Sequence, residues 1–312
     1  MNTSKVTEFI LLGIPFLHDL HRIFFVIGLF VYMVAIMGNG FILIIVTFEP
    51  RLQTPMYIFL SNLALLEICY TTTVVPKLLQ TLMQPRTKIC FHCCLAQNFF
   101  YFTFAGSELL VLTAMSFDRY LAICKPLQYP LIMTKNVCIH LSLATWYVSF
   151  VLFLSQCLVF WQMPFCGSNV VDNFFCDSAA MFSLVCTDTS VSEFVGFLSA
   201  ILMIVVTLIF TTVSYACIIS TVMNISSALG RKKAFSTCTS HLIVVCILYG
   251  ALIAMYMRPT VHSSSHLTRV LAVLNTAFIP MLNPFIYTIR NAEVKNVIRN
   301  VIRKKQLLNN DF

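Results

Sequence analysis

Seven long runs of apolar residues follow one another along this chain of 312 residues. A helix needs roughly 20 residues to cross about 30 Å of hydrocarbon, and every run reaches that length. The runs cover residues 23–48, 56–80, 91–122, 138–161, 194–222, 235–257 and 267–290. They are continuous and do not alternate with a period of two, which favours helices over the strands of a membrane barrel. The sequence therefore predicts an all-α membrane protein, a seven-transmembrane helix bundle.

Charge agrees with this prediction and orients it. Only 10% of the residues are charged, against about 25% in soluble domains. When the loops are assigned alternately to two sides, 13 of the 20 Lys and Arg residues fall on the side of Arg119. Basic residues are enriched in cytosolic loops, so we expect a multi-pass plasma-membrane protein with its N-terminus outside. The net charge of +8 is mostly this bias and gives no sign of nucleic-acid binding. We expect a single domain over 1–312, made of an extracellular tail 1–22, the bundle 23–290 and a cytosolic tail 291–312.

Two features of the outer side fit an oxidising compartment. Asn2-Thr3-Ser4 is an acceptor sequence for N-glycosylation at Asn2. The loop between residues 162 and 193 carries three cysteines spaced by ten residues, and disulfides persist in such a compartment. Cys94 lies about 37 Å from Arg119 along a helix, which places it at the outer mouth of the third span. A bridge from Cys94 to the loop is feasible. The loop cysteines are Cys166, Cys176 and Cys186.

The cysteines alone leave the pairing open. Cys90 and Cys93 crowd the same helix end as Cys94, and sequence does not determine connectivity. The run Cys-Phe-His-Cys-Cys at 90–94 also contains metal-ligand types, but no second pair of zinc ligands is visible.

Glu67 and Glu108 are the acidic residues deep within the predicted spans. Glu108 lies eleven residues before Arg119, about 16 Å into the membrane on nearly the same helix face. Glu67 reaches a similar depth in the second span. An acid in this setting must pair, take a proton or coordinate something, and two close carboxylates do not easily both ionise. One interpretation is a protonated glutamate bonded to a neighbouring helix; the other is a site for Na⁺ or a shared proton.

Several motifs follow one another along the chain. Residues 115–127 read Met-Ser-Phe-Asp-Arg-Tyr-Leu-Ala-Ile-Cys-Lys-Pro-Leu and end a span on the predicted cytosolic side. With these motifs the chain resembles odorant (olfactory) receptors of the tetrapod class II type, which are rhodopsin-like (class A) G-protein-coupled receptors. Gln53 and Phe117 depart from the common residues His and Tyr. The other motifs are Gly38-Asn39, Leu-Gln-Thr-Pro-Met-Tyr at 52–57, Asn-Leu-Ala-Leu-Leu-Glu at 62–67, Lys-Ala-Phe-Ser-Thr-Cys-Thr-Ser-His at 233–241 and Pro-Met-Leu-Asn-Pro-Phe-Ile-Tyr at 280–287.

The resemblance implies a switch and a partner. A heterotrimeric G protein of the stimulatory olfactory type would enter a cytosolic crevice and raise cAMP. It also implies the disulfides Cys94–Cys176 and Cys166–Cys186, and a sodium pocket at Glu67 and Glu108. A short amphipathic eighth helix in the tail, and a basic turn over residues 231–233, would lie at the lipid surface. The implied switch residues are Asp118, Arg119, Tyr120, Tyr215, Asn283, Pro284 and Tyr287.

Pro284 has a physical role of its own in this switch. It removes a backbone hydrogen bond inside the seventh span and produces a kink, and Asn283 is able to satisfy the freed groups. Kinks also occur in static bundles.

The resemblance places an odorant pocket between the outer halves of spans three, five, six and seven. Its residues are mostly apolar with a few hydroxyls, which suits small neutral volatiles such as alcohols, aldehydes, ketones and esters. Tyr101 stands where amine receptors carry an acid, and Ala277 stands where a visual pigment carries its lysine. Arg269 is expected at the rim of the pocket as a solvated interfacial residue. The implied ligand set is Tyr101, Phe102, Ala105, Gly106, Gly196, Ser199, Ala200, Met203, Tyr249, Leu252, Ile253, Tyr256, Val273 and Thr276.

Three alternatives belong to other classes. An intramembrane protease would use two Asp residues and a Gly-rich motif, whereas the chain has Glu67 and Glu108, and no motif of a soluble hydrolase or phosphate loop occurs. A transporter would show paired broken helices in two related halves, and we find one strong break. A class A receptor for a small hydrophobic ligand outside olfaction is the third. We expect a receptor that is not an enzyme.

Overall fold

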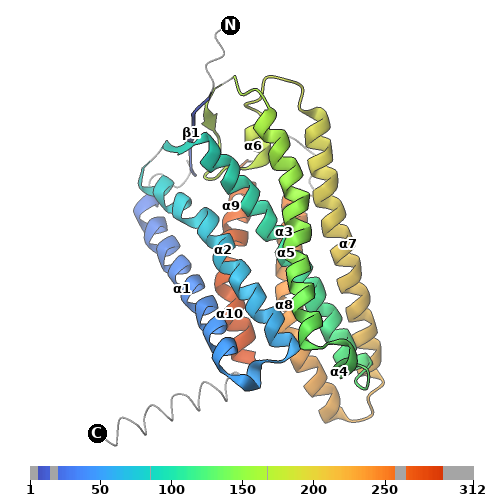
Figure 1. Ribbon diagram of the computed structural model, residues 1–312. Coiled ribbons are helices and arrows are strands. Elements are labelled where there is room, and N and C mark those ends of the chain that lie inside the picture. The colour runs from blue at the N-terminus through green and yellow to red at the C-terminus, as the bar shows by residue number, and fades with distance from the viewer. Residues whose placement is uncertain (1–5, 15–19, 85, 167, 257–264, 291–312) are drawn as a thin grey trace, which may run out of the picture.

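The computed structural model describes residues 6–14, 20–84, 86–166, 168–256 and 265–290. Within these ranges, seven long helical segments run side by side as a bundle (Figure 1). Three short helices lie in the connections: η2 (Pro50–Leu52), α4 (Tyr129–Ile132) and α6 (Ser178–Phe182). The long segments are α1 (His21–Phe48), α2 (Pro55–Met83), α3 (Phe91–Cys124), α5 (Lys135–Gln162), α7 (Ser190–Met223), α8 (Ala228–Tyr256) and a composite of α9 (Ser265–Val273), the π-helix η3 (Leu274–Phe278) and α10 (Ile279–Arg290).

The predicted seven-helix membrane fold is confirmed. Six of the described segments are long and apolar enough to span a membrane, and α8 contains a shorter apolar stretch, His241–Met255. Helix α8 begins at Ala228, before the predicted start at 235. The expected basic turn over 231–233 is therefore wrong: these residues belong to the first turns of α8, because Arg, Lys and Ala favour helix whether or not lipid surrounds them.

A three-stranded sheet, which the all-α prediction did not include, caps one end of the bundle. The central strand β1 (Glu8–Leu11) pairs antiparallel with β2 (Thr87–Cys90) and parallel with β3 (Val170–Val171). Phe9 and Leu11 are fully buried among residues of α3 and of the segment after α5. The apolar run in the N-terminal tail explains why part of the tail folds. We call this the sheet end and the opposite end, which holds α4, the Arg119 end (Figure 1).

The seventh segment is irregular at two places. Residues 274–278 form a π-helix, and Pro284 lies inside α10. Pro284 has no N–H, so the carbonyl of Pro280 loses its donor within the helix. Asn39 Nδ2 donates to that carbonyl at 3.0 Å and to Ala35 O at 3.0 Å. The expectation that Asn283 would do this is wrong, because Asn283 Nδ2 donates to Glu67 Oε1.

The Gly38-Asn39 motif thus serves the contact between α1 and α10. A Cβ atom on Gly38 would lie 3.0 Å from both Cβ and Cγ of Pro284, so only glycine lets the two helices approach closely. A second proline, Pro76, lies inside α2. The expectation of one strong break is therefore wrong, because two of the described helices contain an internal proline.

Replacing Asn39 with Ala should lower the thermal stability of the receptor. The change leaves the buried Pro280 carbonyl without a donor, at a cost of about 1 kcal/mol or somewhat more inside a membrane bundle. We expect the melting midpoint of purified receptor to fall by several degrees. Tyr32→Phe is the matched control, since it removes an exposed contact from the same helix, Tyr32 Oη to Thr72 Oγ1 at 3.2 Å. Equal midpoints for the two variants would contradict the assignment.

Candidate functional site

At the Arg119 end, Asp118 and Arg119 form a buried ion pair. Asp118 is 0% exposed, and Arg119 Nε donates to Asp118 Oδ2 at 3.0 Å, with Nη2 on the same oxygen. Tyr129 of α4 donates from its hydroxyl to Asp118 Oδ1 at 2.9 Å. Burial, and then the nearby charge of Asp118, raises the pKa of Tyr129 well above its ordinary value, so the hydroxyl stays protonated and keeps donating. Both oxygens of Asp118 are therefore occupied, one by the adjacent cation and one by the loop.

A second polar contact joins α7 to α8 near this pair. Tyr215 Oη lies 2.6 Å from His241 Nδ1, and both residues are buried. Tyr120 is half-buried and packs against the apolar cluster around Tyr215. Tyr287 is buried, and its hydroxyl has no hydrogen-bond partner among the described residues. Tyr120 and Tyr215 thus meet in one cluster, whereas Asn283 contacts Glu67 and Pro284 lies against Gly38 of α1.

Mid-bundle, Glu67 and Glu108 are brought within interaction range of each other. Glu67 is 1% and Glu108 4% exposed. Asn283 Nδ2 donates to Glu67 Oε1, which links α2 to α10. One oxygen of each acid, Glu67 Oε2 and Glu108 Oε1, is buried without a hydrogen-bond partner among the described residues. Such an orphaned pair of oxygens suits a proton or a small cation, because oxygen ligands are what hard cations prefer.

The predicted ligand residues lie in the half of the bundle toward the sheet end. Tyr101 belongs to an apolar cluster with Tyr70 and Phe175, and Tyr249 and Leu252 belong to the larger central cluster. Ile253 is exposed, and the side chain of Tyr256 lies outside the part that the structure describes. The buried members are Tyr101, Gly106, Tyr249, Leu252 and Thr276, and the partly buried members are Phe102, Ala105, Gly196, Ser199, Ala200, Met203 and Val273.

Three of these residues have informative contacts. A Cβ atom on Gly106 would lie 2.8 Å from Phe153 Cε2 and 3.0 Å from Met203 Sδ, so α3 touches α5 and α7 closely there. Ser199 donates its hydroxyl proton to Val195 O and Thr276 to Ala272 O, each at 2.8 Å. Both oxygens keep lone pairs, so toward a ligand these hydroxyls act as hydrogen-bond acceptors.

Three disulfides lie near the sheet end. Cys94 pairs with Cys176 and Cys166 with Cys186, with Cα separations of 5.4 and 5.8 Å that are ordinary for disulfides. The third joins Cys90 to Cys93, which sequence reasoning had left without an assignment. All three use cysteines outside the lipid-facing parts of the helices. Seven further described cysteines are free.

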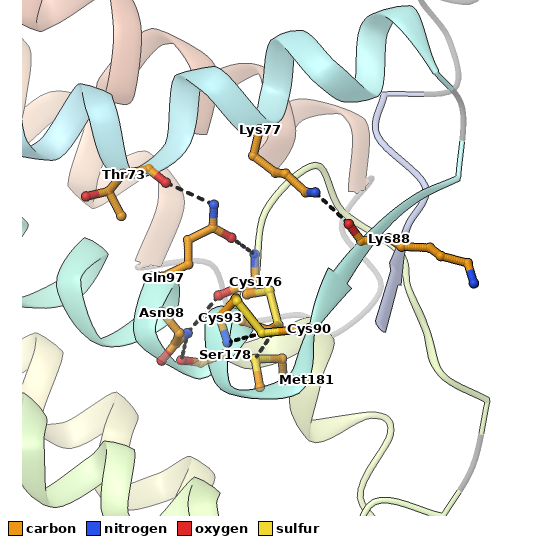
Figure 2. Close-up of a disulfide and its surroundings, with 11 residues drawn as sticks. Thr73, Lys77, Lys88, Cys90, Cys93, Gln97, Asn98, Cys176, Ser178 and Met181 are labelled. Atoms are coloured by element: carbon orange, nitrogen blue, oxygen red, sulfur yellow. Dashed lines mark hydrogen bonds between the residues drawn. A yellow bond between two sulfur atoms is a disulfide. The ribbon is translucent and has the colours of Figure 1, made fainter. Parts of the chain in front are cut away.

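The backbone of Cys176 is also held by side chains of α3 (Figure 2). Gln97 Oε1 accepts from Cys176 N at 3.0 Å, and Asn98 Nδ2 donates to Cys176 O at 2.8 Å. Gln97 Nε2 donates to Thr73 O at 2.9 Å, close to the Pro76 break in α2. The segment after α5 is therefore fixed over the bundle by one covalent bond and several polar ones. Sequence reasoning missed Gln97 and Asn98, although two amides one turn from Cys94 were a visible signal.

Arg269 does not behave as a solvated rim residue, and that expectation is wrong. It is 4% exposed. Its Nη2 lies 2.6 Å from Asp172 Oδ1 and donates to Asp172 O at 2.8 Å. The long segment after α5 brings Asp172 over α9, which covers the guanidinium and neutralises its charge. Arg269 is therefore already paired and offers little to an anionic ligand.

Comparison with known proteins settles the family. The family model described as olfactory receptor matches residues 29–305, which includes all seven helical segments in whole or in part. The chain belongs to the olfactory receptor family. It is 50% identical to olfactory receptor 6X1 of Homo sapiens over 96% of each chain, and 43% identical to olfactory receptor 6E1 of Mus musculus over 98% of each chain. Olfactory receptor 6C3 of Homo sapiens is 42% identical over 97% of this chain and 98% of its own.

This olfactory receptor is therefore an odorant receptor and not an enzyme. The intramembrane protease and the transporter are excluded as interpretations of Glu67 and Glu108. Asn2 and the predicted amphipathic helix from residue 291 onward lie outside the described residues.

Proposed function

We propose that small, mostly apolar volatiles bind between α3, α7, α8 and η3 and drive a stimulatory olfactory-type heterotrimeric G protein, which raises cAMP. The observation that carries the proposal is the ion pair at the Arg119 end. Asp118 is fully buried and holds Arg119. Such an ion pair can stabilise the inactive bundle and break when the helices rearrange. In this proposal the receptor spans the plasma membrane with its sheet end outside, since basic residues concentrate on the Arg119 side.

Neutral ligands fit the polar groups of the site best. Arg269 is already paired with Asp172, and the hydroxyls of Ser199 and Thr276 are placed to accept hydrogen bonds. We therefore propose alcohols first, because they donate a hydrogen bond to such hydroxyls. Aldehydes, ketones and esters come second, because they are neutral but carry no donor. A cAMP reporter screen in cells against volatiles grouped by functional group tests this. A response restricted to carboxylates and abolished by Arg269→Ala would overturn it.

We further propose that Glu67 and Glu108 hold Na⁺ or a shared proton. The support is the pair of buried, unpartnered carboxylate oxygens beside Asn283. A bound cation would neutralise the pair and stabilise the arrangement in which α2, α3 and α10 meet. The cation would then disfavour the rearranged, active bundle.

The Glu67→Gln and Glu108→Gln variants should each lose most of the dependence of stability on this cation. Wild-type receptor is expected to melt at a higher temperature in NaCl than in choline chloride if the cation is Na⁺, or to melt higher as pH falls if it is a proton. Each variant should show a much smaller dependence than wild type, because the amide carries no charge to attract Na⁺ and takes up no proton, and one carboxyl group remains at the site. If the melting temperatures of the variants changed with salt and with pH by the same amounts as that of wild type, the result would count against the site.

A further inference from the structure

The receptor function proposed above makes no use of the Cys90–Cys93 disulfide. The Cα atoms of the two residues are 5.1 Å apart. Cys90 ends β2 and is the N-cap residue of α3, and the backbone N–H of Cys93 donates to Cys90 Sγ at 2.9 Å. Figure 2 shows this pair beside Cys176 and its contacts. The structure therefore holds a Cys-x-x-Cys disulfide at the N-terminus of a long helix.

This placement favours exchange chemistry. Helix N-termini and Cys-x-x-Cys spacing both stabilise the thiolate that is released when such a disulfide opens. A stabilised thiolate leaves faster and shifts the equilibrium toward the reduced pair. Lys77 Nζ donates to the carbonyl of Lys88, two residues before Cys90, at 2.6 Å. Glu8, opposite Cys90 in the sheet, is ion-paired with Lys88 Nζ at 2.6 Å, so these three side chains leave a net positive charge near the helix end. His92 lies inside the motif, with its ring 4.9 Å from that of Trp161.

Exposure separates this pair from the structural one. Cys90 and Cys93 are both exposed, whereas Cys94 and Cys176 are both 0% exposed. A small thiol in solution can therefore reach the first disulfide but not the second. Cys166 and Cys186 are exposed as well, but neither caps a helix, and they close a separation of 20 residues. Only the Cys90–Cys93 pair combines access with a stabilised leaving group.

We propose that Cys90–Cys93 is a site of reversible thiol–disulfide exchange with small extracellular thiols. The thiolate of a small thiol attacks Cys93 Sγ and forms a mixed disulfide. The Cys90–Cys93 bond breaks, and Cys90 leaves as a thiolate that accepts from Cys93 N–H. A second small thiol attacks the small-molecule sulfur of the mixed disulfide, which releases the oxidised dimer of the small thiol and the Cys93 thiolate. Two thiols are thereby oxidised, the cysteine pair is reduced by two electrons, and the protons pass through water.

The exchange takes place where the sheet meets α3. Cys90 lies opposite Glu8 in the pairing of β2 with β1, and α3 starts at the next residue, Phe91. Opening the pair removes a second covalent link, beside the main chain itself, between the end of β2 and the first turn of α3. The Cys94–Cys176 bond, which ties the following helical turn to the rest of the sheet end, stays closed.

Differential alkylation on intact cells tests the proposal, which rests on the proposed outward orientation of the sheet end. Cells displaying the full chain are treated with graded reduced glutathione and then with a membrane-impermeant maleimide, and fragmentation mass spectrometry assigns each label. Cys90 and Cys93 should be labelled at glutathione concentrations about tenfold lower than those that open the other two disulfides. Oxidised glutathione should reverse the labelling. Opening of all three pairs together, or free Cys90 and Cys93 in untreated cells, would overturn the proposal.

A matched variant and a second reagent separate the possible failures. Cys90→Ser with Cys93→Ala keeps a hydroxyl at the N-cap position. It should lose the low-glutathione labelling and keep the Cys94–Cys176 bond, whereas persistent labelling near 90–94 would contradict the assignment. If only a membrane-permeant maleimide labelled the pair, the orientation in the proposed function would be wrong and extracellular thiols would be excluded as the substrate.

Discussion

Replacing Cys176 with Ser should abolish the odorant response and remove most folded receptor from the cell surface. Loss of a disulfide costs about 2 to 5 kcal/mol, a large share of the stability of a single domain. Here the bond also positions a fully buried backbone that Gln97 and Asn98 hold from α3. Without it, Phe174 and Phe175, which are buried in the cluster with Tyr101, lose their anchor. Surface immunolabelling together with the cAMP response measures both effects.

The control for this prediction is Cys217→Ser. Cys217 is a free, exposed cysteine of α7, so its replacement removes a thiol and no bond. Its surface level should equal that of wild type. A Cys176→Ser receptor with normal surface level and normal response would show that the bond is dispensable.

Asp118→Asn should raise basal G-protein activation about threefold to tenfold. The change removes the charge that holds Arg119 while preserving the shape of the side chain. A loss of about 1 kcal/mol from the inactive arrangement changes a two-state ratio about fivefold. Basal cAMP in the absence of odorant, divided by the surface level of each variant, is the measurement.

Two further variants should differ from Asp118→Asn in the size of the rise in basal activity. Tyr129→Phe removes the hydrogen bond to Asp118 Oδ1 and leaves the ion pair, so its rise should be smaller. Glu49→Gln breaks an exposed ion pair with Arg51 at the same end, where the atoms are 3.9 Å apart, and should leave basal activity unchanged because exposed pairs contribute little. An unchanged basal level in a well-displayed Asp118→Asn receptor would show that the ion pair does not restrain the inactive receptor.

The fold followed from the sequence because a bilayer restricts the choice of structure. Residues that cross hydrocarbon must satisfy their backbone internally, so apolar runs of sufficient length predicted each span and its order. Helix ends were less accurate where polar residues favour helix. Helix α8 starts at Ala228 in a basic, apolar-poor segment, and hydrophobicity alone does not detect such a start.

The site was predictable where it depends on position along one helix. Counting from Arg119 brought Glu108 to the depth of Glu67, and the structure places the two acids together. Contacts between distant segments were not predictable in this way. The Asn39 bond to Pro280, the pairing of β1 with β3 and the burial of Arg269 by Asp172 each join residues far apart in the chain. No local pattern marks such partners.

Nucleotide exchange on a purified G protein tests the central claim most directly. The receptor would be reconstituted in lipid nanodiscs with a stimulatory olfactory-type heterotrimer, and guanine-nucleotide exchange would be followed with and without neutral volatiles. We predict that at least one alcohol, aldehyde, ketone or ester accelerates exchange, and that Cys176→Ser receptor does not respond to it. Two results together would contradict the account. No neutral volatile would change the exchange rate with folded wild-type receptor, and the unliganded Asp118→Asn variant would not raise it either.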